Sequence, residues 1–170
     1  MPAYVTPSPD VKRIQQKSSA TCWLATCKML YKWKGKDPGD VETLLQNASD
    51  DRVDYDFWCE AGLGHGDCVP LAKTLGFKWG AGGKLTMPLI VSTLKKFGPI
   101  MAMGQWNNPN GAHAILICSA MDIDDESDES GFLKIANPWF GSDERETRSL
   151  SWFNGGQGDW LGVNGQYIHW

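Results

Sequence analysis

The sequence lacks the segments that would place a protein in a membrane. No apolar run approaches the roughly 20 residues that a membrane-spanning helix requires. The N-terminus, MPAYVTPSPD, also lacks the basic and apolar regions of a signal peptide. We therefore expect a protein that does not insert into membranes and is made in the cytosol without a signal peptide.

Positive charge is scarce as well. The chain has 16 Lys and Arg residues against 20 Asp and Glu residues, which gives a net charge of -4 and a pI near 5.3. Nucleic acids and anionic membranes are bound by basic surfaces. The composition therefore argues against both as partners and directs the search for function to a cleft.

A complete set of disulfides is excluded by the cysteine count. The chain has five cysteines, an odd number, so at least one thiol stays free. Its 170 residues, 42% of them hydrophobic, suffice to bury a core without covalent staples. We expect one domain spanning residues 1–170.

Helical spacing dominates the first part of the chain. Apolar residues at helical intervals predict helices over about 21–33, 68–75 and 88–97, and a short helix capped by Asp40. Gly76 and Gly98 stand where two of these helices should stop. Residues 1–98 are therefore predicted to form a mainly helical half.

The pattern changes after residue 98. The short apolar runs IMAM, HAILICSA and FLKIA, separated by turn residues, predict an antiparallel sheet within 99–170. The acidic segment DIDDESDES is predicted to be a solvated hairpin loop, and the Gly-rich tail NGGQGDWLGVNGQ to fold over the sheet edge. The fold class is thus α+β, with an N-terminal helical half packed on a C-terminal antiparallel β-sheet.

Cys22 stands where a nucleophile would be activated. It begins the first predicted helix, and the unpaired N–H groups and dipole of a helix N-terminus favour a thiolate. Gln16 lies six residues upstream, in the loop that leads into this helix. Its amide and the backbone N–H of Cys22 could together form an oxyanion hole.

His113 is the best candidate for the general base among three histidines. It opens the predicted strand HAILICSA, and Asn137 ends the next strand. The Asn137 side chain could accept a ring N–H and fix the tautomer of the histidine. Trp139 could shield that hydrogen bond from water. His65, in a Gly-rich loop, is the alternative base, and His169 is expected on the surface of a terminal strand.

The remaining cysteines have plainer interpretations. Cys27 and Cys118 fall within apolar patterns and are expected in the core. Cys59 and Cys68 flank GLGHGD, so that with His65 they could supply three metal ligands, but no fourth ligand is evident. We expect no metal site.

Three short motifs in this order resemble the papain superfamily, and more closely the compact bacterial papain-like proteases of the AvrRpt effector type. They are QKSSATCW at 16–23, GAHAI at 111–115 and IANPW at 135–139. Many of these relatives have Asp as the third catalytic residue, where this chain has Asn137. The Asn-Ser-Trp typical of papain is Asn-Pro-Trp here.

The resemblance implies a papain-like fold and a cysteine protease that needs no metal or organic cofactor. It implies that Cys22, His113 and Asn137 form the catalytic triad, with Gln16 in the oxyanion hole. Trp23 and Trp139, beside two of these residues in the sequence, are predicted to line the substrate groove.

We therefore expect an endopeptidase that acts on a protein substrate. The resemblance further implies an effector or antibacterial toxin domain, exported by a dedicated secretion system, active in the cytosol of a target cell and paired with an immunity protein. The alternatives are a deamidase or transglutaminase, a peptidoglycan amidase, a leader-peptide peptidase and a binding module with an inactive site.

Overall fold

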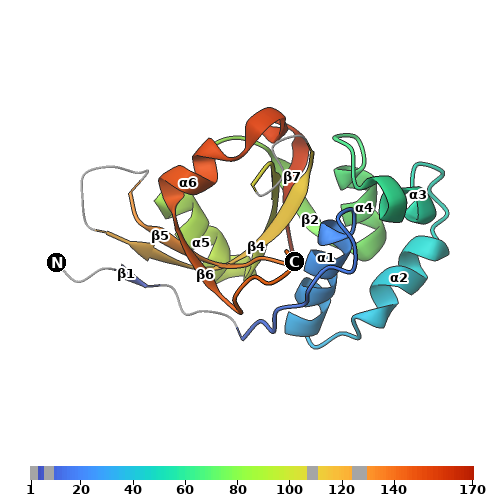
Figure 1. Cartoon of the computed structure of the whole chain (residues 1–170), viewed down its shortest axis with the longest axis horizontal. Coiled ribbons are helices and arrows are strands. Elements are labelled where there is room, and N and C mark those ends of the chain that lie inside the picture. Colours follow the sequence, from blue (N-terminus) through green and yellow to red (C-terminus); the bar gives the residue numbers. More distant parts are fainter. Residues whose placement is uncertain (1–3, 6–9, 107–110, 124–129) are drawn as a thin grey trace.

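The computed structural model describes residues 4–5, 10–106, 111–123 and 130–170 (Figure 1). Along the chain the elements are β1 (Tyr4–Val5), α1 (Cys22–Trp33), α2 (Gly39–Gln46), α3 (Tyr55–Ala61), α4 (Cys68–Leu75), β2 (Lys78–Ala81), α5 (Met87–Phe97), β3 (Ile100–Gly104), β4 (His113–Asp122), β5 (Phe132–Ala136), β6 (Glu146–Ser149), α6 (Leu150–Gly155), the 3-10 helix η1 (Gly158–Trp160) and β7 (Asn164–His169). None of the helices in these described ranges has the length and apolar character needed to cross a membrane.

The strands form one antiparallel sheet in the order β2-β7-β3-β4-β5-β6, and β1 pairs with the far end of β4. Helices α1 to α4 lie on one side of this sheet, and α5 and α6 lie on the other (Figure 1). The chain therefore forms three layers with the sheet in the middle.

Alternation along the strands divides the core between the two faces of the sheet. In β3, Met101 and Met103 pack in the cluster that contains α1 and α4, whereas Ile100 and Ala102 pack in the cluster that contains α5 and α6. All five residues of β3 are buried, as expected for a central strand covered on both faces. The sheet is thus held rigidly between two helical layers.

The predicted α+β architecture, with a helical N-terminal half and an antiparallel sheet, is confirmed. The helices predicted over 21–33, 68–75 and 88–97 correspond to α1, α4 and α5, and the three apolar runs form β3, β4 and β5. Gly76 ends α4 in the left-handed conformation, with φ of 75°. Asp40 lies in the first turn of α2 rather than at its cap.

Three features differ from the prediction. Residues 1–98 also contain β2, whose sequence KWGA has no β-branched residue to indicate a strand, and α3 was not predicted. The Gly-rich tail forms the end of α6, the 3-10 helix η1 and a turn, and its last three residues, 164–166, begin β7, which lies inside the sheet between β2 and β3. Residues 124–129 of the predicted acidic hairpin lie outside the described residues.

Gly98 ends α5 where the indole of Trp33, at the end of α1, packs against its backbone. Its φ is 83°, and a Cβ atom there would collide with the Trp33 ring. Gly76 has a similar φ of 75°, but a Cβ atom there would meet nothing within 4 Å. The two glycines also differ in ψ, which is -151° at Gly98 and 20° at Gly76, so Gly98 combines the overlap with a conformation that only glycine adopts readily.

We expect Gly98→Ala to lower the free energy of unfolding by about 2 kcal/mol or more, since overpacking adds to strain. Gly76→Ala, which suffers only the strain, should cost about 1 kcal/mol. Urea unfolding followed by tryptophan fluorescence measures both. Equal losses in the two variants would contradict the contact with Trp33.

Candidate active site

Cys22 is the first residue of α1 and is 3% exposed. Thr21 precedes it but makes no capping hydrogen bond to the helix. Its Oγ1 instead accepts from the N–H groups of Lys17 and Ser18, at 3.2 and 3.0 Å. The first N–H groups of α1 therefore remain available to the sulfur. Those of Cys22 and Trp23 oppose the rise in the pKa of the thiol.

His113 and Asn137 make a buried hydrogen bond. His113 Nε2 lies 2.8 Å from Asn137 Oδ1, and the two residues are 1% and 0% exposed. Since the amide oxygen can only accept, Nε2 carries the proton of this bond. Nδ1 is then the ring nitrogen left to accept a proton from a thiol.

The start of β4 adjoins the sulfur of Cys22. The backbone N–H of Ala114 opposes the rise in the pKa of the Cys22 thiol. Ala112 borders the same cavity as Cys22. One chain neighbour of His113 thus acts on the thiol and the other borders its cavity, so His113 stands in the segment of β4 that adjoins Cys22.

Burial opposes charge on either group alone. It raises the pKa of the Cys22 thiol, and the N–H groups of Ala114, Trp23 and Cys22 itself oppose this effect. It also lowers the pKa of His113, against the hydrogen bond that the ring donates to Asn137 and the negative charge of Glu146. A thiolate and an imidazolium formed together would attract each other, which offsets part of the cost of charging either group alone.

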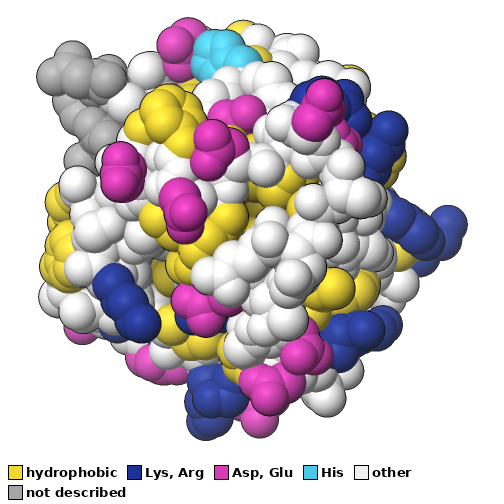
Figure 2. Space-filling model, turned by 90° about the vertical axis from the view of Figure 1, so that its right-hand side faces the viewer, with side chains coloured by type: hydrophobic (Ala, Val, Ile, Leu, Met, Phe, Trp, Pro, Cys, Tyr) yellow, Lys and Arg dark blue, Asp and Glu magenta, His cyan; other side chains and the backbone are white. Residues whose placement is uncertain are grey.

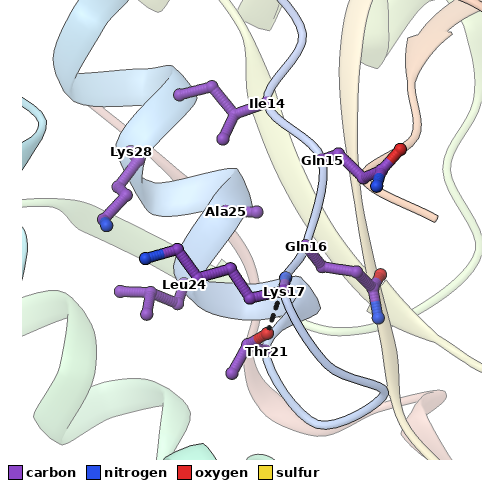
Figure 3. Close-up of a pocket in the computed structure, with 8 residues that line it drawn as sticks. All are labelled: Ile14, Gln15, Gln16, Lys17, Thr21, Leu24, Ala25 and Lys28. Atoms are coloured by element: carbon purple, nitrogen blue, oxygen red, sulfur yellow. Dashed lines mark hydrogen bonds between the residues drawn. The ribbon is translucent and has the colours of Figure 1, made fainter. Parts of the chain in front are cut away.

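Gln16 is 2% exposed. The side chains of Ile14 and Lys17 lie toward α1, and that of Gln16 points to the opposite side of the segment (Figure 3). Its Nε2 donates to Ser18 O at 2.7 Å, while Oε1 has no partner among the described residues. Since a primary amide has two N–H bonds, one remains for a ligand. The geometry thus leaves a donor available for an oxyanion.

A cavity of about 430 Å³ opens beside Cys22, between the loop before α1, the end of α3 and the start of β4. Most of its lining is small or apolar. It consists of Ser19, Ala20, Cys22, Glu60, Ala61, Gly62, Leu63, Met103, Gly111 and Ala112. The narrow side chains leave room for an extended polypeptide next to the thiol.

The sequence also matches a protein family over most of its length. The family described as papain-like cysteine protease AvrRpt2 matches residues 6–157. The chain belongs to this family. It is thus a papain-like cysteine protease by family membership, and its fold agrees.

A solved structure described as a putative C39-like peptidase from Bacillus anthracis matches with a TM-score of 0.58 at 14% identity, over 95% of this chain and 94% of that one. A double glycine motif protease from an AMS/PCAT transporter, in complex with the leader peptide, matches with a TM-score of 0.48 at 12% identity, over 99% and 96% of the two chains. No curated protein is significantly similar in sequence. The likeness to the first structure supports the papain-like fold.

The two tryptophans predicted to line the groove of the protease lie elsewhere. Trp23 is 0% exposed, and its Nε1 donates to Trp58 O at 3.2 Å. Its ring also meets Tyr55 edge-on, so it packs α1 against α3 and is not on the groove surface. Trp139 stands edge-on to His113, at 5.6 Å between ring centroids. It therefore packs against His113 and is not among the residues that line the cavity.

The alternative candidates stay apart from this site. His65 lies 3.6 Å from Asp159 and packs against Trp160. His169, in β7, stacks on Phe97 at 4.3 Å. Cys27 and Cys118 are fully buried in the core, as predicted. In the described part of the chain, no group of His, Cys, Asp and Glu side chains has the arrangement of a metal site.

Two contributors to the site were not predicted from the sequence. Thr21 leaves the helix N-terminus uncapped, and Arg13 donates to the backbone of the segment that carries Asn137. Arg13 has no sequence signal, because its partners are backbone carbonyl groups. Thr21 precedes the helix, as a cap would, so the pattern alone suggests the opposite role.

The pKa of His113 lies below its ordinary value of about 6.5, so the neutral base dominates at pH 7. Activity should fall only when the pH drops through this lowered pKa, so the acid limb of kcat/KM should lie below pH 6.5. Asn137→Ala removes a bond that raises this pKa. We expect the acid limb to move to still lower pH and the plateau to fall about tenfold or more.

The check is kcat/KM for a quenched peptide as a function of pH. Asn47→Ala is the matched control, since that exposed amide only donates to Thr43 O. An acid limb that stays in place in Asn137→Ala would contradict the role of this hydrogen bond.

Proposed function

We propose that this protease is an endopeptidase that cleaves a protein substrate through a thioester on Cys22, with His113 as acid and base and Asn137 as its orienting partner. The observation that carries the proposal is the buried His113–Asn137 bond at 2.8 Å, beside a thiol at an uncapped helix N-terminus. The cavity at Cys22 supplies the place for the substrate.

Acylation begins with transfer of the thiol proton to His113 Nδ1. Sγ then attacks the carbonyl carbon, and the carbonyl π electrons move to oxygen. The oxyanion accepts from the backbone N–H of Cys22 and from the free N–H of Gln16 Nε2. As the tetrahedral intermediate collapses, His113 donates its proton to the leaving nitrogen, and the amine product departs.

Deacylation uses the same groups in reverse order. Neutral His113 takes a proton from water, and the resulting hydroxide attacks the thioester carbon. The carbon–sulfur bond breaks, the acid product leaves, and the thiolate recovers its proton from His113. Asn137 holds the imidazole plane in both stages.

The natural setting of the enzyme is the finer part of the proposal. We place it among effectors or antibacterial toxins that a dedicated secretion system delivers into the cytosol of a target cell. A protease whose catalytic groups are all in place would damage the cell that makes it. A cognate immunity protein that occupies the cavity beside Cys22 would prevent this.

We expect Cys22→Ala to abolish cleavage, because the attacking atom is lost. Expression of wild type and variant in bacteria, with mass spectrometry of protein N-termini, should reveal new N-termini only with the wild type. Cys59→Ala is the matched control, since that thiol is half-buried and its interactions are with Tyr55 and the charged residues around it. New N-termini in cells with Cys22→Ala would refute the mechanism.

A deamidase would use the same acyl-enzyme and give another product. Glutamine side chains converted to glutamate, without any new N-terminus, would replace the peptidase by this alternative. Unchanged proteins and equal growth of both cultures would favour an amidase that acts outside the cytosol, or a binding module.

Glu60 gives the cavity a negative charge. It is the one ionisable carboxylate among the lining residues, and positions 53–72 include Asp54, Asp56 and Asp67 but no Lys or Arg. Figure 2 shows acidic side chains around hydrophobic hollows on the face that the helical half contributes, with most Lys and Arg toward its rim. The cleft should favour substrates with a basic side chain near the cleaved bond.

We expect Glu60→Gln to lower kcat/KM for a basic peptide by roughly threefold to fivefold, since exposed charge pairs contribute little. A neutral peptide should be unaffected, and Glu60→Lys should favour an acidic one. Asp40→Asn, on α2, is the control. Added salt should reduce the preference, and a preference that ignores Glu60 would disprove its role.

A further inference from the structure

Three consecutive backbone carbonyl groups beside the catalytic histidine are held by one short segment. Arg13 Nε donates to Asn137 O at 2.7 Å, and Arg13 Nη2 donates to Trp139 O at 2.5 Å. Between them, the backbone N–H of Gln16 donates to Pro138 O at 2.9 Å. We call residues 13–16 the strap and residues 137–139 the turn.

The strap is itself anchored at several points. The backbone N–H of Arg13 donates to Glu144 Oε1 at 2.8 Å. Ile14 lies over α1 and packs against the core on that side, whereas Gln16 points to the other side of the strap (Figure 3). The guanidinium of Arg13 therefore extends from a fixed piece of backbone.

The turn controls where Asn137 presents its amide oxygen. Asn137 Oδ1 lies 2.8 Å from His113 Nε2 and accepts from the backbone N–H of Trp139 at 3.0 Å. The turn follows the end of β5 and lies outside any helix or strand. Trp139 O also accepts from the backbone N–H of Ser142 at 3.2 Å, so the strap shares in holding this carbonyl and binds those of Asn137 and Pro138 as well.

We propose that Arg13 is a positioning residue for catalysis: by holding the turn at its first and last carbonyl groups, it fixes Asn137 and, through Asn137, the ring plane of His113. The strap also carries Gln16, so one segment joins the oxyanion donor to the pair that orients the base. This inference rests on the proposed function and assigns a further residue to the same site.

The chemistry of arginine suits the task. Its planar guanidinium presents several N–H donors in fixed directions, and a charged donor strengthens each hydrogen bond. Two of its nitrogens reach carbonyls that lie two residues apart. A lysine has a single ammonium nitrogen on a flexible stem, so it would fix the turn less well.

The first experiment needs no knowledge of the substrate. Alkylation of Cys22 by iodoacetamide, followed by mass spectrometry of its peptide from pH 5 to 9, reports on the thiolate that His113 supports. We expect Arg13→Ala to lower the alkylation rate at pH 6.5 by about tenfold and Arg13→Lys to lower it less. Arg52→Lys is the control, because Arg52 pairs with Asp50 on the surface.

The second experiment shows whether Arg13 acts through Asn137. In the Asn137→Ala background, Arg13→Ala should lower the alkylation rate by less than about threefold, because the pathway is already broken. An equal loss in both backgrounds would overturn the proposal, as would an Arg13→Ala profile identical to that of the wild type. Circular dichroism verifies folding, and Arg13→Lys is decisive if Arg13→Ala does not fold.

The outcomes separate this inference from the proposed function. If Cys22 of the wild type reacts like an ordinary thiol and no peptide is cleaved, the proposed function and this inference both fail. If the wild type shows a reactive Cys22 and cleavage, but the Arg13 variants keep both, only the role of Arg13 is disproved.

Discussion

The hydrogen bond between His113 and Asn137 depends on the register in which β4 and β5 pair. Leu116 lies opposite Ala136 in this ladder. If this register is extended by one pair, Asn137 lies opposite residue 115. Residues 113 and 115 share a face of the sheet because side chains alternate along a strand. Asn137 is therefore the diagonal neighbour of His113 on that face. A slip of one residue would send the two side chains to opposite faces. The buried alternation of β4 and β5, with the two helical layers packed against it, makes such a slip costly, so the core maintains the alignment on which catalysis rests.

Burial of both reacting groups sets the electrostatics of the site. Each is nearly inaccessible to water, and burial shifts the two pKa values in the directions that disfavour charge. Most buried polar groups resolve this by permanent pairing. Here the N–H groups at the start of α1 and of β4 meet the thiol, and the amide of Asn137 meets the imidazole. A negative charge on the thiol and a positive charge on the imidazole would therefore each have polar partners. Both charges exist only when the proton has passed from Cys22 to His113.

The spacing of apolar residues predicted those helices and strands that bury one clear face. Helical periodicity located α1, α4 and α5, and the apolar runs located β3 to β5, because each of these segments buries a clear face. The motifs around Cys22, His113 and Asn137 also indicated which residues should meet. Prediction failed where the structure depends on distant partners. The strand β7 comes from a Gly-rich tail and finds its place only between β2 and β3, and Gly165, with φ of 84°, allows the chain to approach Cys68 there. Trp23 was assigned to the groove from its position in the sequence, but α3, which was not predicted, covers it.

The same distinction explains why the support of the catalytic residues escaped the sequence. A hydrogen bond between two side chains requires suitable residue types at two positions, which a sequence can show. Arg13 and Thr21 instead bind backbone atoms, which every residue has. Their roles appear only once the chain has brought residue 13 next to residue 137. Cys22 and His113 begin regular elements that the core holds in place, whereas Asn137 follows β5 in a turn that the strap binds. The loops that complete the site have no such core and are held by hydrogen bonds to main-chain groups instead. In this protein, the residue types at the site can therefore be recognised in the sequence. The contacts that fix their orientation cannot, because they are made to backbone groups.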